Sequence, residues 1–309
     1  MHLHHHWTGL PPEARGASVT MGNFDGVHRG HRALIEHART ALPGAPLGVI
    51  TFEPHPRQFF APEAPPFRLM GPATRAHRLE RLGVDHLYEL PFDAVLSGME
   101  AADFIRAVLV EGLGIRHLTV GQDFHFGRRR GGDVAMLAAM GREHGFGVSA
   151  LPLVGEGGVA FSSTAIRAAL SEGRPEEAAR SLGHWHRIDG PVIHGEKRGR
   201  VLGFPTANRA LDGLHLPCFG IYAVLVDILT GPHAGESHRG AASIGVRPTF
   251  GQSAPNLETF LLDFEGDLYG AELSVALVAY IRPELAFASI EALTDRMAQD
   301  VAEVRRILA

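Results

Sequence analysis

Residues 21–31 read Met21-Gly22-Asn23-Phe24-Asp25-Gly26-Val27-His28-Arg29-Gly30-His31. A short apolar run, Ala17 to Met21, leads into this stretch, and a segment with apolar residues on one helical face, Leu34 to Leu42, follows it. The pattern predicts a strand, a glycine-rich turn and a helix. Open α/β sheets bind ligands at the carboxyl ends of their strands, and a helix N-terminus presents N–H groups to anions. We therefore expect an anion site at this turn.

Strands and helices alternate through the first part of the chain. Four further apolar runs predict strands, and helical patterns such as Ala101 to Leu113 and Asp133 to His144 separate them. This alternation is typical of a parallel sheet covered by helices, as in a Rossmann-like α/β domain. The four runs are Leu47 to Phe52, His86 to Leu90, Arg116 to Val120 and Gly147 to Leu153.

After Trp185 the pattern changes to short alternating runs between closely spaced glycines and prolines. We interpret this part as a small antiparallel β-barrel with a C-terminal helix that begins after an N-cap at Ser289. The expected layout is a flexible leader over 1–16, a first domain over 17–185 and a barrel domain over 186–309. The runs that predict barrel strands are Gly220 to Ile228, Leu257 to Phe264 and Leu273 to Tyr280.

Composition excludes several classes of protein. The 309 residues carry a formal charge of -5, which argues against broad binding to nucleic acid or membranes. Cys218 is the only cysteine, so no internal disulfide forms, and no apolar run approaches the length of about 18 residues that spans a bilayer. We expect a cytoplasmic protein without a secretory signal, and the sequence leaves a homo-oligomer open.

Two other features have competing interpretations. The histidines among residues 1–6 could bind a metal ion, but no further ligands follow at metal-site spacing, so we favour a leader without function. The run Arg128 to Arg130 is either a solvated turn or a contact for a polyanion. Its place between predicted elements of the first domain favours a phosphate contact.

The chemistry of the first domain centres on two predicted helix starts. His28 and His31 lie on one side of the first helical turn and could donate to phosphate oxygens, although so short a motif also arises by chance in a chain with 19 histidines. Ser163 and Thr164 open a later helix, where they could equally be simple caps, and Arg167 adds a cation one turn further on. Together these residues predict a cradle for the triphosphate of ATP, with Mg²⁺, for attack at the α-phosphate.

The second domain has a basic, glycine-spaced loop from His194 to Gly203 that could fold over phosphates. Just after it, Thr206 and Asn208 share one face of an extended segment, and their neutral oxygens suit Mg²⁺; the alternative is two solvent-facing residues in a turn. Alternation predicts that Glu258 points into the barrel as a general base for attack at the γ-phosphate. The alternative for Glu258 is a surface position at a strand end.

These motifs, in this order, resemble the prokaryotic bifunctional riboflavin kinases/FMN adenylyltransferases, the FAD synthetases. The resemblance spans nearly residues 17 to 308 and implies that riboflavin becomes FMN in the second domain and FMN becomes FAD in the first, with ATP used in both steps. The segments that carry it are Gly22 to His31, Thr51 to Pro56, Gly121 to Gly127, Ser162 to Arg167, His194 to Asn208, Gly220 to Tyr222, Ser243 to Phe250 and Leu257 to Gly270.

The resemblance also implies roles for residues at the matching positions. His28, His31 and Arg167 would be catalytic in the first domain, and Glu258 would activate the terminal ribityl hydroxyl beside the flavin of the second. Thr206 and Asn208 would hold Mg²⁺. ATP of the first domain would contact Gly22, Phe24, Gly26, His28, His31, Asp123, Ser163, Thr164 and Arg167; ATP of the second would contact Gly195, Lys197, Gly199, Gly203, Pro205, Thr206 and Asn208; the flavin of the first would contact Pro54, Pro56, Arg57 and Phe126.

The sequence departs from the family pattern at two places. Gly183 to His186 stands where a Gly-Arg-Pro-aromatic junction is expected, and Val246 replaces an expected threonine. Neither change touches the proposed chemistry. Two alternatives remain beside the main interpretation: only one of the domains is active, or the chain is a flavin-binding or regulatory protein without turnover.

Overall fold

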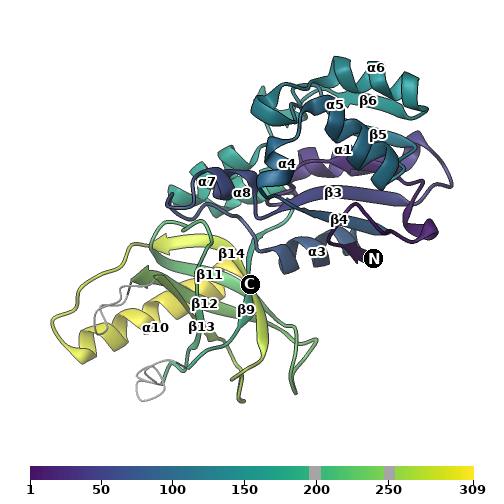
Figure 1. Ribbon diagram of the computed structural model, residues 1–309. Coiled ribbons are helices and arrows are strands. Elements are labelled where there is room, and N and C mark those ends of the chain that lie inside the picture. Colours follow the sequence, from purple (N-terminus) through teal and green to yellow (C-terminus); the bar gives the residue numbers. More distant parts are fainter. Residues whose placement is uncertain (195–202, 247–254) are drawn as a thin grey trace. The chain divides into compact units, whose positions relative to one another are not determined.

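The computed structural model describes residues 1–194, 203–246 and 255–309, and the chain forms two compact units (Figure 1). The first unit comprises Met1–Pro65 and Pro72–Phe161, and the second comprises Pro66–Gly71 and Ser162–Ala309. Each unit has its own sheet and its own hydrophobic core.

A six-stranded parallel sheet lies at the centre of the first unit. Its strands are β1 (His2–His4), β2 (Ser18–Met21), β3 (Leu47–Glu53), β4 (His86–Pro91), β5 (His117–Gly121) and β6 (Gly147–Leu151). The order β1-β4-β3-β2-β5-β6 places β3 and β5 on opposite sides of β2. Open α/β sheets bind ligands where the strand order reverses in this way, at the carboxyl ends of the strands.

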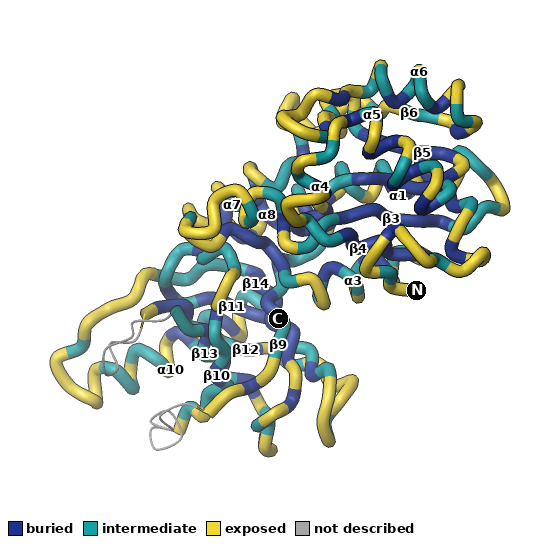
Figure 2. Tube along the Cα trace, in the orientation of Figure 1, coloured by how far each residue is buried: buried dark blue, intermediate teal, exposed yellow. Residues whose placement is uncertain are grey.

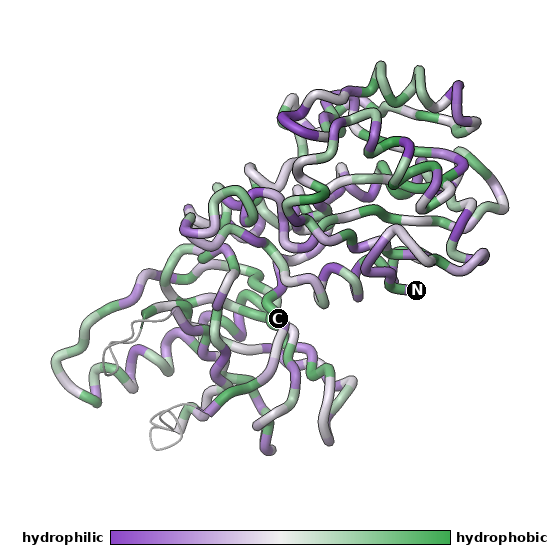
Figure 3. The backbone as a smooth tube through the Cα atoms, viewed as in Figure 1, coloured by the Kyte–Doolittle hydropathy of each residue, from purple (hydrophilic) through white to green (hydrophobic). Residues whose placement is uncertain are grey.

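The predicted α/β fold of this unit is confirmed, and the five expected strands end within two residues of their predicted bounds. Every residue of β2 is buried, as are the first five residues of β3 and of β4. Figure 2 shows these central strands in the buried class, and Figure 3 shows that they are also largely hydrophobic. Strands covered by helices on both faces are rich in apolar residues, which is why they stand out in the sequence.

Helices complete the first unit. α1 packs against β2, β3 and β5, and α6 packs against β6. The expected helix over Ala101 to Leu113 is present, but only its first turn is an ordinary α-helix, and Phe104–Gly112 is π-helical. The helices are α1 (Arg29–Ala41), α2 (Pro56–Phe60), α3 (Pro72–Arg81), α4 (Ala94–Gly98), α5 (Ala101–Asp103) and α6 (Val134–His144); short 3-10 turns cover Pro12–Ala14 and Arg128–Arg130, and β7 (Gly155–Glu156) pairs with β8 (Val159–Ala160).

The prediction of a flexible leader over residues 1–16 is wrong. His2–His4 form β1, which pairs in parallel with β4, and Trp7 is buried in the core of the first unit. The His4 Nε2 lies 3.1 Å from Nδ1 of His86 on the neighbouring strand. Backbone pairing tolerates polar side chains on an edge strand, so the histidines do not prevent this strand from forming.

The second unit contains a six-stranded antiparallel sheet that curls into a nearly closed barrel, in the order β10-β13-β12-β11-β14-β9. A bridge between Ile193 and Asn208 links the chain beyond β9 to β10. The predicted C-terminal helix α10 (Ile290–Ile307) is confirmed, and the Ser289 hydroxyl caps it. The strands are β9 (His186–Pro191), β10 (Ala207–Ala210), β11 (Gly220–Ile228), β12 (Ser237–Val246), β13 (Pro255–Leu261) and β14 (Glu272–Arg282).

Two further helices, α7 (Ser163–Ser171) and α8 (Pro175–Leu182), belong to the second unit by their contacts. α8 packs against β9 and β14, and Leu69 of the segment Pro66–Gly71 joins the apolar cluster between α7 and α8. The predicted boundary lies after residue 185, whereas the contacts group the chain from Ser162 onward with the barrel. Pro175 and Gly183 mark the two ends of α8 in the sequence. The sequence does not show whether α8 packs on the core of the first unit or on that of the second.

His186 on β9 makes the stability of the second unit depend on pH. The side chain is buried, and burial lowers its pKa to about 3, with smaller contributions from the charges of His184 and His215. The unfolded chain binds a proton near the ordinary pKa of 6.5, so stability is complete above pH 6.5 and declines as pH falls from there toward 3. From this residue we expect a loss of about 1.4 kcal/mol between about pH 7.5 and about pH 5.5.

Urea unfolding of a Trp7→Phe protein, followed by the fluorescence of Trp185 beside His186, measures this loss in the second unit. The same protein with His186→Gln should lose less free energy of unfolding over the same pH interval, because glutamine does not titrate. Equal losses in the two proteins would show that protonation of His186 is not the cause.

Two candidate active sites

The turn between β2 and α1 places two imidazole rings face to face. His28 is the N-cap residue of α1, and its Nδ1 accepts a hydrogen bond from the backbone N–H of His31 at 3.4 Å. The two rings stack with their centroids 3.7 Å apart. An acceptor role for Nδ1 assigns the proton of a neutral His28 to Nε2, which gives that edge of the ring donor character.

His31 is half-buried beside the buried His28. Burial lowers the pKa of His31 well below its ordinary 6.5, and the neighbouring His28 lowers it further. The His31 Nδ1 is buried, and the described part of the chain offers it no hydrogen-bond partner. The ring also packs on Phe24, with centroids 4.8 Å apart. At neutral pH His31 is therefore an uncharged imidazole with one donor nitrogen.

The backbone of this turn is strained and firmly held. Phe24 and Val27 have φ angles of 51° and 45°, which lie in the left-handed region that residues other than glycine rarely adopt. Both residues are fully buried. Such conformations persist only where surrounding packing imposes them. Gly30 has no room for a side chain without a shift, since an added Cβ would lie 3.1 Å from the His28 ring. Phe24, which was predicted as an ATP contact, is thus a buried residue that packs beneath the His31 ring and supports the turn.

The loop after β5 carries the other predicted residues on this side of the sheet. Asp123 is exposed directly after the strand, whereas Phe126 is buried and packs on Phe104, with ring centroids 5.7 Å apart. Phe126 is part of the core cluster, and Phe124 stacks on it. Arg128 pairs with Glu100 at 3.0 Å, and the two arginines that follow have positive φ angles of 53° and 60°. The role of these arginines as phosphate contacts stays a prediction.

In the second unit, the start of α7 holds hydroxyls and a fixed cation. Ser162 caps the helix, because its Oγ accepts the backbone N–H three residues on at 3.1 Å, so Ser163 and Thr164 occupy the first turn. The Arg167 Nε donates to the carbonyl oxygen of Phe67 at 2.6 Å, and its guanidinium lies 5.3 Å from the centroid of the Phe67 ring. The side chain of Arg167 is held in place by these contacts.

The barrel aligns the predicted residues of the second site across three strands. Asn208 on β10 lies directly opposite Glu258 on β13, and Glu258 lies opposite Ser243 on β12. Directly opposite residues of antiparallel strands point to the same face. The Asn208 Nδ2 donates to the carbonyl oxygen of Thr206 at 3.2 Å, and Asn256 donates to the Asn208 Oδ1 at 3.1 Å. The amide of Asn208 therefore has a defined orientation beside the carboxylate.

The prediction that Glu258 points into the barrel is wrong. Leu257 and Leu261 contribute to the apolar cluster inside the barrel, whereas Glu258 alternates with them and shares its face with Phe260. Phe260 packs with Leu262 in the cluster beneath α10. Glu258 therefore belongs to the outer face of the barrel on the side that α10 covers, where it is half-buried.

Two cavities of the second unit share Thr206 in their linings. One, of about 250 Å³, lies on the Glu258 face and is enclosed by side chains from the barrel and from α10, which include Phe204, Phe260 and Met297. The other, of about 280 Å³, is lined by Pro205, Phe264, Leu268 and Tyr269. Gly203 at the end of the basic loop has a φ of 84°. The predicted contacts Gly195, Lys197 and Gly199 lie outside the described residues.

Two family models match the chain, one to each half. The FAD synthetase model matches residues 10–165, and the riboflavin kinase model matches residues 182–308. The chain belongs to the bifunctional riboflavin kinase/FMN adenylyltransferase family. The resemblance noted in the sequence is thereby confirmed.

Curated members of the family match over nearly their whole length. The chain is 45% identical to the bifunctional riboflavin kinase/FMN adenylyltransferase of Pseudomonas fluorescens, over 97% of this chain and 96% of the relative. It is 40% identical to the protein of that name from Escherichia coli K12, over 96% and 93%. A crystal structure described as a macrolide-efflux protein from Streptococcus pneumoniae matches with a TM-score of 0.85 at 30% identity, over 98% of both chains. Among the described residues of this family member, no helix has the length and apolar character to cross a membrane.

Sequence reasoning missed an aromatic group beside the predicted flavin loop of the first unit. After the cis bond between Glu53 and Pro54, His55 caps the short helix α2, which carries Phe59 and Phe60. Their rings meet the ring of Phe92 edge-on, at centroid distances of 5.5 and 5.7 Å. Phe60 is 68% exposed, which is unusual for so large an apolar side chain. The sequence feature that could have indicated this aromatic group is the pair of adjacent phenylalanines directly after a proline-rich loop.

An ion pair in the lining of the cavity on the Glu258 face was also missed. Arg282 at the end of β14 donates to both carboxylate oxygens of Asp300 on α10, at 2.6 to 3.1 Å, and both side chains are mostly buried. Arg296 approaches the same carboxylate at 3.1 Å. The pair ties α10 to the barrel at the edge of the cavity that Glu258 lines. The C-terminal helix was predicted from the sequence, but the charges that it buries were not.

Proposed function

We propose that this chain phosphorylates riboflavin to FMN in its second unit and adenylylates FMN to FAD and pyrophosphate in its first, with ATP as the donor in both steps. One observation carries this proposal: the models of both families match one chain, and each match falls on a unit with its own constellation of polar side chains. The near-complete coverage of the bifunctional relatives supports the same conclusion.

For phosphoryl transfer, Glu258 acts as the general base. Its carboxylate takes the proton of the terminal ribityl hydroxyl as that oxygen attacks the γ-phosphate. Riboflavin occupies the cavity lined by Phe204 and Phe260, and ATP occupies the cavity lined by Tyr269. Because Thr206 lines both cavities, the γ-phosphate would pass beside this residue.

The residues of the second site fit Mg²⁺. Thr206 offers a hydroxyl and Asn208 an amide oxygen, and two neutral hard donors suit a cation that takes its other ligands from water and phosphates. The contact from Asn256 supports this role, because it orients the Asn208 Oδ1. The bound ion would neutralise charge on the transferring phosphoryl group.

For adenylyl transfer, the two stacked histidines serve the phosphates of ATP. His28 and His31 donate to oxygens that gain charge as the FMN phosphate attacks the α-phosphate, and the start of α1 adds backbone N–H groups. Asp123 contributes to the ATP site of the first unit, and Ser163, Thr164 and Arg167 at the start of α7 would bind a polyphosphate. The proline loop with Pro54, Pro56 and Arg57 binds the flavin, and Phe126 supports that site from the core. A cytoplasmic location fits these substrates.

Incubation of the purified protein with riboflavin, Mg²⁺ and ATP, followed by chromatographic separation of the flavins, tests the proposal. We expect FMN to appear first and FAD to follow. FMN alone would mean that only the kinase is active. Unchanged riboflavin, together with no conversion of added FMN, would leave a flavin-binding protein without turnover.

The exposed ring of Phe60 should stack on the isoalloxazine of FMN during adenylyl transfer. Stacking of an aromatic side chain on a base contributes about 1–3 kcal/mol, so Phe60→Ala should raise the KM for FMN by about 5- to 150-fold. Initial rates at several FMN concentrations measure the change. Val95→Ala on α4 is a matched control, because Val95 is also an exposed apolar residue of the first unit. Equal effects of the two substitutions would contradict this role.

A further inference from the structure

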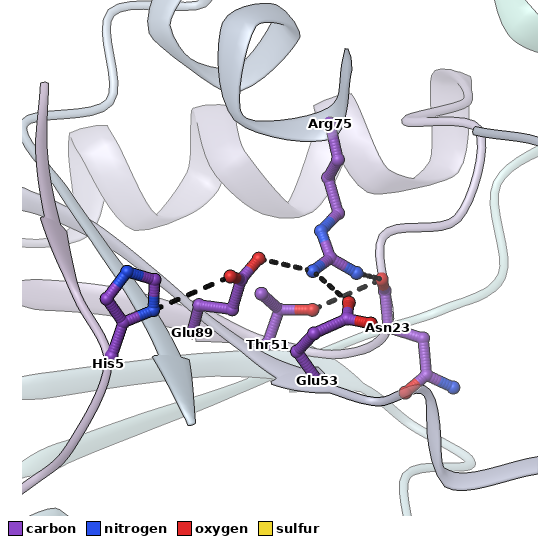
Figure 4. Close-up of polar contacts among 6 residues, drawn as sticks. All are labelled: His5, Asn23, Thr51, Glu53, Arg75 and Glu89. Atoms are coloured by element: carbon purple, nitrogen blue, oxygen red, sulfur yellow. Dashed lines mark hydrogen bonds and ion pairs between the residues drawn. The ribbon is translucent and has the colours of Figure 1, made fainter. Parts of the chain in front are cut away.

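A buried arginine joins the two loops that the adenylyl-transfer site depends on. Arg75 on α3 is 3% exposed, and its Nη2 donates to Glu89 on β4 at 2.7 Å and to Glu53 at the end of β3 at 3.1 Å. Its Nη1 donates to the backbone carbonyl oxygen of Asn23 at 3.4 Å. Figure 4 shows the guanidinium between these three acceptors, which come from the ends of three adjacent strands.

The acceptors are the anchor points of the two substrate loops. Asn23 lies in the turn that leads to His28, next to Phe24 with its strained backbone. Glu53 directly precedes Pro54, where the proposed flavin loop begins. The Thr51 Oγ1 also donates to the Asn23 carbonyl oxygen, at 3.2 Å, so that oxygen is held from both β3 and α3. A shift of the guanidinium would release both loops together.

Stability alone does not account for this network. Burying charges is unfavourable, and replacing a buried ion pair with apolar groups of similar volume is often neutral or stabilising. Glu89 is itself buried, and the exposed ring of His5 approaches it at 3.7 Å. An arginine fits the place because its planar fork can hold three acceptors in fixed directions, which an apolar side chain or a lysine cannot do.

We infer that Arg75 is a positioning residue for adenylyl transfer, which holds the ATP turn at Asn23 and the flavin loop at Glu53 in one rigid frame. This inference rests on the proposed function of the first unit. In-line attack requires the FMN phosphate and the α-phosphate to be aligned closely, and a misplacement of about 1 Å can lower a rate about 10²-fold. Arg75 itself touches neither substrate.

The decisive variant is the double substitution Arg75→Met with Glu89→Leu, which removes the buried cation and its buried partner together and keeps their volume. We expect this protein to melt at nearly the wild-type temperature and to keep its riboflavin kinase rate within about twofold. Its kcat/KM for adenylyl transfer should fall about 30- to 100-fold, with higher KM values for both ATP and FMN. The single variant Arg75→Lys, which keeps Glu89, should lose less kcat/KM for adenylyl transfer than the double variant but should not match the wild type, because an ammonium group reaches only some of the acceptors.

Arg15→Met is the matched control. Arg15 also donates to backbone carbonyl groups, those of Glu111 and Gly112, but it precedes β2 at the opposite end of the sheet. This control should leave the KM values for ATP and FMN unchanged. Wild-type KM and kcat values in the folded double variant would overturn the inference, as would a loss of adenylyl transfer that only follows the folded fraction of the protein.

If the double variant does not fold, Thr51→Val and Glu53→Gln test the same frame by removing one contact at a time. Each should raise a KM for adenylyl transfer, that for ATP with Thr51→Val and that for FMN with Glu53→Gln, and unchanged values in both would overturn the inference. Failure of the proposed function has a different outcome, because the wild-type protein would then convert no FMN to FAD. If the wild-type protein converts FMN to FAD and the variants have unchanged KM values, only the role of Arg75 is refuted.

Discussion

Glu258→Gln should lower the rate of riboflavin phosphorylation by about 10²- to 10⁴-fold while the conversion of FMN to FAD continues at its normal rate. Glutamine keeps the volume of the side chain and its neighbours Asn208 and Ser243, but it cannot accept the proton of the attacking hydroxyl. The size of the effect follows from the usual contribution of a positioned general base. Separate initial rates with riboflavin and with FMN as the substrate measure the two reactions in one preparation.

Two comparisons make the Glu258 result specific. Glu258→Asp keeps a carboxylate but withdraws it by one methylene, so it should retain more kinase activity than Glu258→Gln. Glu272→Gln changes an exposed carboxylate at the start of β14 and should leave both activities unchanged. If Glu258→Gln keeps a normal kinase rate, or if it also abolishes FAD formation in a folded protein, the assignment of Glu258 as the base of a separate site fails.

His31→Ala should have the reverse effect and lower adenylyl transfer by about 10²- to 10³-fold, with the kinase rate preserved. The loss corresponds to the removal of one preorganised donor from a site where charge develops on phosphate oxygens. Because burial holds the pKa of His31 well below 6.5, the imidazole stays neutral above that pH. The wild-type rate should therefore show no decline from protonation of His31 as pH falls from about 8 to about 6.5.

The control for His31 lies on the same helix. His37 is half-buried on α1, where its ring lies 6.3 Å from that of His117, and His37→Ala should leave adenylyl transfer within about twofold of wild type. Rates are compared at saturating and at limiting ATP, since a donor to the phosphates affects kcat as well as KM. An equal loss in the two variants would indicate damage to the helix, and no loss in His31→Ala would remove His31 from the mechanism.

Several features of this protein follow from local sequence. The buried strands β2 to β5 are recognisable as short runs rich in apolar residues, because helices cover the sheet, and Ser289 stands as an N-cap before the last helix. The turn between the first strand and the first helix was also predictable, since its position follows from the order of elements. These are short-range effects, determined by residues a few positions apart.

Other features depend on contacts between distant parts of the chain. The strand β1 forms because β4 offers a backbone partner, although His-Leu-His has no strong strand pattern. Alternation along β13 separates the face of Glu258 from the face of Leu257, but only the packing of α10 decides that the Glu258 face lies outside the barrel and lines a cavity. Arg75 looks like an ordinary charge on a surface helix until the ends of β3 and β4 bring two carboxylates to it.

The family was thus determined by the sequence, because motifs at strand and helix ends record local chemistry. Tertiary structure alone decided which face of a strand is covered, which charge is buried and which loops are held by the same residue. The physical reason is that burial and ion pairing depend on what packs against a residue, and for Glu258 and Arg75 those neighbours come from elements far away in the chain.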